Sequence, residues 1–292
     1  MRVTVVIPAY NAVATVAEAV RAVVQQVGVP ADQRECIVAS DASSDGTDGA
    51  ARAAGATVVR LPLNRGCGAA RNAGIRAARG RWIAFTDADC VPSRRWLAEL
   101  LSSAERADRR TLGVAGRTVG LESATPAARF MDLIGALDAE NYVRHAVSPW
   151  APSCNLAYRR EDLLAVGGFD PSMRSYETCE LHRRLVRAFG GGIELAPRAV
   201  VMHRHRATWA ALWRQQLSYG RGHGEFLRRH SEVWPWSRRQ ELGAWARTLG
   251  LAVRAAASAR GDEGLVRRGL LVKHLAQRIG FAQAYFGDGG RP

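Results

Sequence analysis

Acidic side chains follow two segments of the chain that have the composition of buried strands. Asp41 and Asp45 come after the run CIVAS, and Asp87 and Asp89 come after the run WIAFT. A carboxylate beyond a strand can accept hydrogen bonds from a ribose hydroxyl or a base N–H. Two carboxylates spaced i and i+2 in a tight turn can hold a divalent cation against a diphosphate, whose charge otherwise repels them. Solvated turns are the commoner meaning of such pairs, but the apolar run directly before Asp87 favours a ligand site.

A glycine-rich turn that carries arginines, NRGCGAARNAG, occupies residues 64–74. Gly66 and Gly68 permit close approach of the backbone, and Arg65 and Arg71 offer guanidinium donors to an anionic group. The alternative interpretation is a helix that packs closely through its alanines and glycines. The patterns GxGxxG, GxxxxGK[ST] and GxSxG are absent from the chain, which argues against dinucleotide redox, P-loop and α/β-hydrolase chemistry.

Two further groups of polar residues lie later in the chain. Glu177 and Glu180 are spaced i and i+3 at the start of a predicted helix, where acids also complement the helix dipole. His203 and His205 alternate at the end of a predicted strand, so their side chains would point the same way. A lone His is usually structural, whereas two beside a predicted cation site are better candidates for ligands.

Alternating strand and helix segments position these groups. Residues 3–7 are a short β-branched run of the kind that forms buried parallel strands. Helical patterns, strand runs and polar or glycine-rich turns then alternate through residue 86, which predicts a doubly wound parallel sheet with a ligand at the carboxyl ends of its strands. Past residue 115 the pattern changes, and the predicted elements are helices at 130–137 and 181–189, a loop entering a strand at 150–160, a turn at GGFDPSM, short strands at 193–195 and 199–202, and helices from about 206.

The net charge of +14 is unevenly distributed along the chain. Residues 201–292 hold 16 Arg and Lys against 6 Asp and Glu, whereas the first 200 residues hold 25 against 21. Five of the eight tryptophans also lie past residue 200, namely Trp209, Trp213, Trp234, Trp236 and Trp245. Arginine with tryptophan is typical of a surface that meets an anionic membrane or a nucleic acid. The alternative is a solvated helical tail whose tryptophans pack into the body of the protein.

The composition excludes several classes of protein. A hydrophobic content of 47% is that of a globular chain and excludes a disordered one. No segment approaches ~20 uninterrupted apolar residues, and no cleavable signal opens the chain, so a cytoplasmic protein without a spanning helix is expected. The five cysteines are odd in number and form no CxxC pair. They are expected to be free, mostly buried thiols in a reducing compartment, without zinc.

Taken in order, these motifs resemble those of a known family. VIPAYNA, SDASSDGTD, NRGCGAARNAG and FTDADCVP resemble the nucleotide-sugar-binding half of the family 2 inverting glycosyltransferases. NLAYRREDLLAVGGFD, YETCEL and VMHRHR resemble that family's acceptor half, so the resemblance covers about residues 1–206. It implies a GT-A fold, in which helices flank a mixed, mostly parallel, Rossmann-like sheet, here followed by a C-terminal helical appendage. The expected parts are a nucleotide-sugar-binding half at 1–115, an acceptor-binding half at 116–206 and a helical region at 207–292.

The resemblance also implies an activity and the residues that carry it. The expected enzyme is hexosyltransferase-like, uses Mg2+ or Mn2+, and transfers sugar from a UDP-sugar or another nucleotide-diphosphate sugar to a hydroxyl. Asp87 and Asp89 match the family's DxD, with Asp89 as metal ligand and His203 completing the metal site. Trp150 to Asn155 would border the sugar and the acceptor. The remaining donor-site positions are Pro8, Ala9, Tyr10 and Asn11 around the nucleobase, Asp41 at the base or ribose, and Arg65, Gly68, Arg71 and Ala88 along the nucleotide sugar.

This chain departs from the family pattern at two positions. Ser40–Asp41 stands where the family usually has paired acids, which removes one carboxylate near the base. Glu177–Thr178 stands where the family commonly has Glu-Asp, with the Asp as general base. Because threonine cannot act as a base near neutral pH, either Glu177 or Glu180 takes that role or the protein is a catalytically impaired sugar-nucleotide binder. A nucleotidyltransferase is a third hypothesis, and the absence of Lys from the nucleotide-binding half argues against it.

The acceptor is left open by the sequence. The C-terminal Arg and Trp residues favour a lipid-linked or membrane-proximal acceptor, with peripheral contact at the inner face of a membrane. A secondary metabolite or peptide that carries negative charge would suit the same residues. No nucleic-acid partner is expected, because the basic surplus belongs to the C-terminal region and not to the whole chain.

Overall fold

The computed structural model describes residues 1–144, 149–257 and 260–287, which divide into two compact units. The first unit contains the described residues of Met1–Leu121, Gly135–Ser172 and Glu177–Arg204. The second contains the described residues of Glu122–Ile134, Met173–Tyr176 and His205–Pro292. The chain therefore crosses between the units several times.

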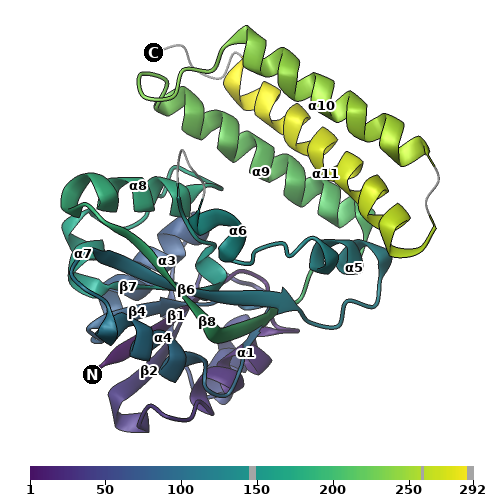
Figure 1. Ribbon diagram of the computed structural model, residues 1–292. Helices are drawn as coiled ribbons and strands as arrows, with labels where there is room; N and C mark the ends of the chain where they lie inside the picture. The colour runs from purple at the N-terminus through teal and green to yellow at the C-terminus, as the bar shows by residue number, and fades with distance from the viewer. Residues whose placement is uncertain (145–148, 258–259, 288–292) are drawn as a thin grey trace. The chain divides into compact units, whose positions relative to one another are not determined.

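Within the described residues, the first unit holds one eight-stranded sheet in the order β3-β2-β1-β4-β7-β6-β8-β5 (Figure 1). Parallel pairs join β1 to β2 and β4, β2 to β3, and β6 to β8, while β7 is antiparallel to both its neighbours and β5 to β8. This confirms the predicted mixed, mostly parallel sheet. The strands are β1 (Val3–Ala9), β2 (Arg34–Ser40), β3 (Thr57–Arg60), β4 (Trp82–Phe85), β5 (Cys90–Pro92), β6 (Thr111–Gly120), β7 (Leu156–Arg159) and β8 (Gly192–His203).

Both faces of the sheet are buried, which explains the uninterrupted apolar runs in the sequence. Along β1, Val3, Val5 and Ile7 face one hydrophobic cluster and Val6 faces the other, because successive side chains of a strand point to opposite faces. One cluster is covered by α1 (Val16–Val24), α2 (Thr47–Ala53) and α4 (Trp96–Arg106), the other by α3 (Cys67–Ala77), α7 (Arg160–Ala165) and α8 (Glu177–Phe189). The unit also includes the short helix α6 (Glu140–Val143) and two 3-10 turns, Ala31–Gln33 and Ser153–Asn155.

Strands β1 to β4 all run parallel, so the loops that follow them lie at one edge of the sheet. These loops carry the predicted donor-site residues. Helix α3 begins in the loop after β3 and packs closely on β1, because Gly74 has no Cβ to overlap the side chain of Val6. The expected convergence of polar strand ends on one edge is confirmed.

The region past residue 86 differs from the prediction in three respects. The helix expected at 130–137 is α5 (Pro126–Leu133), which ends before Gly135 and Leu137 because both of these residues have positive φ. The two short strands expected at 193–195 and 199–202 are one strand, β8, in which the register against β6 shifts between Gly116 and Arg117. A bulge at this shift breaks the local pattern without ending the strand. A Cβ at Gly116 would overlap the carbonyl oxygen of Ala199, so the close pairing needs this glycine. Strands β5 and β6 and helix α4 were not predicted from the sequence.

The second unit is helical, as expected for the C-terminal appendage. It contains α5 (Pro126–Leu133), α9 (Trp209–Arg229), α10 (Arg238–Ala256) and α11 (Gly261–Tyr285), with α11 packed along both α9 and α10 (Figure 1). Aromatic rings fill its interior: Trp209 packs on Phe130, and Trp236 packs on Phe281. Among the described helices, none has both the length and the hydrophobicity needed to cross a membrane.

Candidate active site

The loops after β1 and β2 are tied together by side chains that accept backbone hydrogen bonds. Asn11, which adopts a left-handed conformation at φ 48°, accepts from the amide of Ser44 through Oδ1 at 2.9 Å. The carboxylate of Asp45 accepts from the amides of Val13 and Thr47, each at 3.1 Å. The hydrogen bond from the Thr47 hydroxyl is the main cause that lowers the pKa of Asp45. These contacts hold the two loops in one backbone conformation, and the Asp45 carboxylate is used in maintaining it.

Asp41 organises the turn that leads into α3. It is buried, and its two carboxylate oxygens accept from the amides of Arg65 and Gly66, both at 2.7 Å. Gly66 has φ 92°, a conformation that side-chain-bearing residues rarely adopt, so the turn depends on this glycine. The predicted base or ribose carboxylate therefore also shapes the glycine-rich turn, while the Arg65 side chain stays exposed.

A buried guanidinium joins the acidic turn after β4 to the start of α8. Arg71 is 3% exposed and donates from Nη1 to Oε1 of Glu177 at 2.8 Å and from Nη2 to Oδ1 of Asp87 at 3.0 Å. Burial acts to lower the pKa of Arg71, but the two carboxylates outweigh it and raise that pKa. The Phe169 ring lies 5.5 Å from the guanidinium carbon. The structure thus brings together three predicted site residues that are far apart in the sequence.

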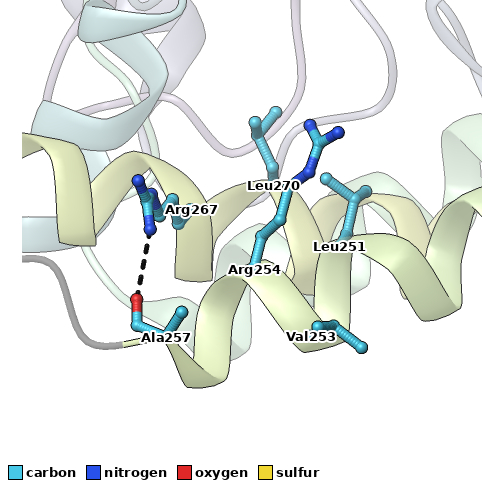
Figure 2. Close-up of a pocket in the computed structure, with 6 residues that line it drawn as sticks. All are labelled: Leu251, Val253, Arg254, Ala257, Arg267 and Leu270. Atoms are coloured by element: carbon cyan, nitrogen blue, oxygen red, sulfur yellow. Dashed lines mark hydrogen bonds between the residues drawn. The ribbon is translucent and has the colours of Figure 1, made fainter.

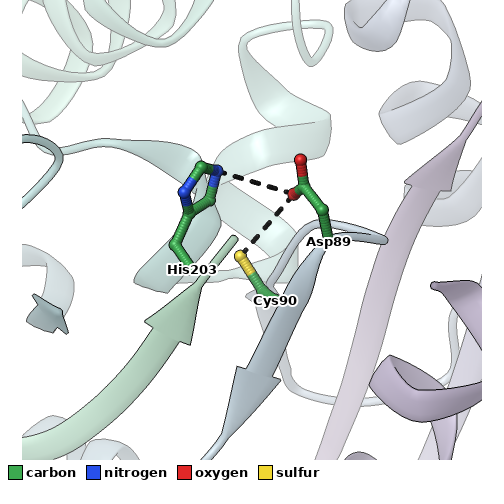
Figure 3. A group of neighbouring side chains, drawn as sticks. All are labelled: Asp89, Cys90 and His203. Carbon is green, nitrogen blue, oxygen red and sulfur yellow. Dashed lines mark hydrogen bonds and ion pairs between the residues drawn. The ribbon is translucent and has the colours of Figure 1, made fainter. Parts of the chain in front are cut away.

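Asp89, the second acid of the DxD, faces a different group of residues (Figure 3). Its Oδ1 lies 3.6 Å from Nε2 of His203 and 4.0 Å from Sγ of Cys90. One ligand atom from each of these three residues lies within 4.8 Å of the other two, so the group could hold a metal ion. The hydrogen bond with Cys154, together with burial, raises the pKa of the Cys90 thiol well above its usual value. Cys90 is therefore a poor ligand for a hard cation, whereas the oxygen of Asp89 and the nitrogen of His203 suit Mn2+ or Mg2+.

Two residues expected at the site are engaged elsewhere. The prediction that His203 and His205 alternate on one strand is wrong, because β8 ends at His203 and His205 belongs to the second unit. Glu180 is 6% exposed and accepts from Nε of Arg184 through both oxygens, at 2.8 and 2.9 Å. Arg184 in turn donates to the carbonyl of Gly168 at 2.6 Å. Glu180 therefore supports the turn before α8, and Glu177 is the glutamate that meets Arg71.

The positions expected near the acceptor have unequal surroundings. Trp150 is half-buried, with its ring 4.8 Å from that of Tyr142. Asn155 is 1% exposed: it accepts from the Trp96 indole N–H at 2.8 Å and donates to the carbonyls of Arg117 and Ala199 at 2.8 and 2.9 Å. Both amide protons of Asn155 are thus used inside the unit, which gives this side chain a structural role.

The other positions predicted to form the donor site differ in their burial. Pro8 and Ala9 are buried at the end of β1, whereas Tyr10 directly after them is 54% exposed. Ala88 is buried between the two acids of the DxD. Gly68 lies in the first turn of α3, where a Cβ would be 3.4 Å from the carbonyl oxygen of Asp170 and from Cβ of Phe169, so this position packs against the loop before α8.

Sequence reasoning missed some residues that hold the site in place. Asn72 donates to the carbonyl of Phe169 at 2.7 Å and accepts from its amide at 2.8 Å, which fastens the loop before α8 to α3. Asn72 lies within the glycine-rich motif, but its partner is 97 positions away. All five cysteines are free thiols, and four of them are buried, as expected.

The fold and the acidic strand ends define a class of protein: a GT-A glycosyltransferase. The chain belongs to glycosyl transferase family 2, whose family model matches residues 4–166. It is 33% identical to the pre-mycofactocin glycosyltransferase of Mycobacterium tuberculosis over 180 residues, which are 60% of this chain and 38% of that relative. The chain therefore matches well under half the length of this relative.

Solved glycosyltransferases share the fold at lower identity. A mannosyltransferase from Pyrobaculum calidifontis, solved with GDP-Man and Mn2+, is 22% identical with a TM-score of 0.69, and the match covers 98% of this chain and 88% of that one. Glucosyl-3-phosphoglycerate synthase from Mycobacterium tuberculosis, solved with Mn2+, uridine diphosphate and glucosyl-3-phosphoglycerate, is 23% identical with a TM-score of 0.56. That match covers 77% of this chain and 78% of the synthase.

Proposed function

We propose that this glycosyltransferase transfers sugar from a nucleotide-diphosphate sugar to an acceptor hydroxyl with inversion, and that Glu177 is its general base. The observation that carries the proposal is the Arg71 bridge, which holds the Glu177 carboxylate beside Asp87 of the DxD turn. In the proposed single displacement, the acceptor oxygen attacks the anomeric carbon from the face opposite the diphosphate. The bond to the diphosphate oxygen breaks, and Glu177 takes the hydroxyl proton.

The surroundings of Glu177 suit a base. Arg71 occupies Oε1, while Oε2 makes no hydrogen bond to any residue that the structure describes. The side chain is 13% exposed, so it is held firmly yet reachable from solvent. Thr178, where the family commonly has its aspartate, is 3% exposed and packs inside the unit. These contacts support Glu177, and not its neighbour, as the group that receives the proton.

Asp89 and His203 are the residues proposed to hold the divalent cation. When bound, Mg2+ or Mn2+ would neutralise charge on the departing diphosphate. Arg71 contributes a permanent positive charge at the same edge of the sheet, because a guanidinium stays protonated in proteins and the two carboxylates beside it favour the charged form. The Mn2+ in the solved mannosyltransferase and synthase supports a cation site here.

The test compares Glu177→Gln with Glu180→Gln in the full chain. GDP-Man and a set of UDP-sugars are screened with Mn2+ by thermal shift, and release of nucleoside diphosphate is then measured with the sugar that binds. Glu177→Gln should keep the donor-induced shift and lose about a hundredfold or more in turnover. Glu180→Gln should lower the melting temperature but keep turnover per folded molecule. Full turnover by Glu177→Gln would remove that residue from the role.

The buried Thr178 also favours a second candidate, a protein that binds sugar nucleotides without transferring them. This candidate predicts donor-induced stabilisation but no nucleoside diphosphate release from any sugar, with or without acceptors. The acceptors to include are lipid-linked hydroxyls, hydroxylated metabolites and peptides, with pre-mycofactocin among them because of the named relative.

A further inference from the structure

The outer side of α10 carries large apolar side chains in water. Leu242, Leu249 and Val253 are 70%, 67% and 66% exposed. Their spacings of seven and four positions place them on one side of the helix, and the exposed Ala246 and Ala256 fall on the same side. Single exposed leucines are ordinary, but a continuous stripe on one helix marks an interaction surface.

The opposite side of α10 is fixed to the rest of the helical unit. Ala244 and Thr248 are buried there, and α10 packs along α11. The helix starts with a capping box between Ser237 and Gln240. The packing and the cap hold α10 in one rotation about its axis, so the stripe is a stable feature of the surface.

The charges on α10 are almost all positive. Its exposed basic residues are Arg238, Arg239, Arg247 and Arg254. Its one acid, Glu241, is used inside the unit: it accepts from the indole N–H groups of Trp236 at 2.9 Å and Trp245 at 2.7 Å, and from Arg278 at 3.1 Å. The outward charge of this helix is therefore basic.

A groove of about 450 Å³ adjoins the stripe at Val253 (Figure 2). Its lining is apolar except for two arginines and consists of Leu251, Val253, Arg254, Ala257, Arg267 and Leu270. Arg254 extends from α10 toward Leu270 of α11, and Arg267 donates to the carbonyl of Ala257 at 3.2 Å. The groove thus combines apolar walls with guanidinium groups, as the stripe does.

We propose that the stripe and groove of α10 are a docking surface for an anionic lipid bilayer. An apolar stripe bordered by arginines matches the boundary between acyl chains and negatively charged headgroups. A second copy of this chain would instead bring the same arginines against one another, because a two-fold contact repeats one patch on both partners. Trp209, Trp234 and Trp236 pack on other aromatic rings of the unit. The leucines and valine of α10 therefore supply most of the apolar contact.

The test measures co-sedimentation of the full chain with vesicles of phosphatidylcholine alone or of equal parts phosphatidylcholine and phosphatidylglycerol. The wild type should partition onto the mixed vesicles, and less so as salt is raised. Leu242→Ser/Leu249→Ser/Val253→Ser should lower the partition coefficient at least about tenfold. Arg238→Gln/Arg239→Gln/Arg247→Gln/Arg254→Gln should lower it about fivefold for each arginine near the headgroups. A matched control, Val24→Ser/Leu164→Ser/Phe189→Ser, removes exposed apolar groups from the first unit and should bind like the wild type.

Three outcomes would overturn the proposal: equal binding to both vesicle types, unchanged binding by the α10 serine variant, or loss of binding by the control. Analytical sedimentation of the protein without lipid tests whether a second copy of this chain covers the stripe instead. A wild-type dimer that the serine variant makes monomeric, with no vesicle binding, would identify the stripe as a contact between copies. Thermal melting verifies that each variant folds. If the serine variant does not fold, the binding of the arginine variant and the salt dependence of wild-type binding test the proposal instead. Donor turnover is measured separately, so the vesicle result stands whether or not the proposed transfer occurs.

Discussion

Replacing Arg71 with methionine tests the bridge at the centre of the site. Methionine keeps an unbranched apolar side chain but lacks the guanidinium group and its positive charge. Arg71 is 3% exposed, and its two hydrogen bonds go to Glu177 and Asp87. The substitution therefore leaves two carboxylates at one edge of the sheet without the cation that separates them.

The magnitude follows from the exposure of the three partners. A hydrogen bond to a charged group contributes about 1.5–3 kcal/mol, and removing one partner of a fully buried pair costs about 3–5 kcal/mol. The Asp87 and Glu177 side chains are 29% and 13% exposed, so water recovers part of the loss. We expect Arg71→Met to lower the free energy of unfolding of the first unit by about 2–4 kcal/mol.

Urea unfolding of Arg71→Met, Glu177→Gln and the double variant measures this coupling. Because the chain has two units, separate fluorescence and circular dichroism transitions are needed to assign the loss. The double variant should be less destabilised than the sum of the single variants by about 1 kcal/mol or more, since the neutral amide no longer needs the cation. Wild-type stability of Arg71→Met, or strict additivity, would refute the bridge as a coupled unit.

Three further predictions concern other parts of the first unit. Burial lowers the pKa of His182 to about 4, so as the pH falls the unfolded chain binds a proton at this histidine before the folded chain does. The free energy of unfolding should therefore fall by about 3 kcal/mol between pH 6.5 and 4, and His182→Gln should flatten that decline in pH-dependent unfolding curves. Asn155→Ala removes three buried hydrogen bonds, to the Trp96 N–H and to the carbonyls of Arg117 and Ala199, so it should lower the free energy of unfolding measured in urea by about 3 kcal/mol or more. A raised acceptor KM at unchanged stability would indicate contact with the acceptor instead. Asp89→Asn and His203→Ala should each weaken the Mn2+-dependent part of the donor thermal shift, and an unchanged Mn2+ titration would place the cation elsewhere.

The first half of the fold was predictable because its strands are buried on both faces. Such strands appear as short apolar runs that end in polar turns, and β1, β2 and β4 fit that pattern. Strand β6 does not, because its sequence TLGVAGRTVG has three glycines and owes its conformation to pairing with β7 and β8. Tertiary pairing of this kind leaves little local signal.

The sequence indicated which polar residues lie near the candidate site, but not which of them form hydrogen bonds with one another. Acids beyond parallel strands must lie at one edge, which located Asp41, Asp87 and Asp89 without a structure. Nothing local indicates that Arg71 pairs with Glu177, 106 positions away, or that Glu180 pairs within its own helix instead. The same types of polar residue occur in structural roles and in catalytic or binding roles, so residue type alone does not distinguish the two. Burial and hydrogen-bond partners, which only the structure gives, distinguish them.

The positive charge of the chain acts in two unlike environments, which its net value of +14 conceals. Arg71 is buried between carboxylates, so its field is neutralised nearby and acts on groups within hydrogen-bond distance. The arginines of α10 are exposed, so their fields add and reach about 8 Å at physiological salt. High salt should therefore weaken attachment to an anionic surface much more than it weakens the Arg71 bridge. A salt series that separates vesicle binding from donor turnover would assign each charge to its environment.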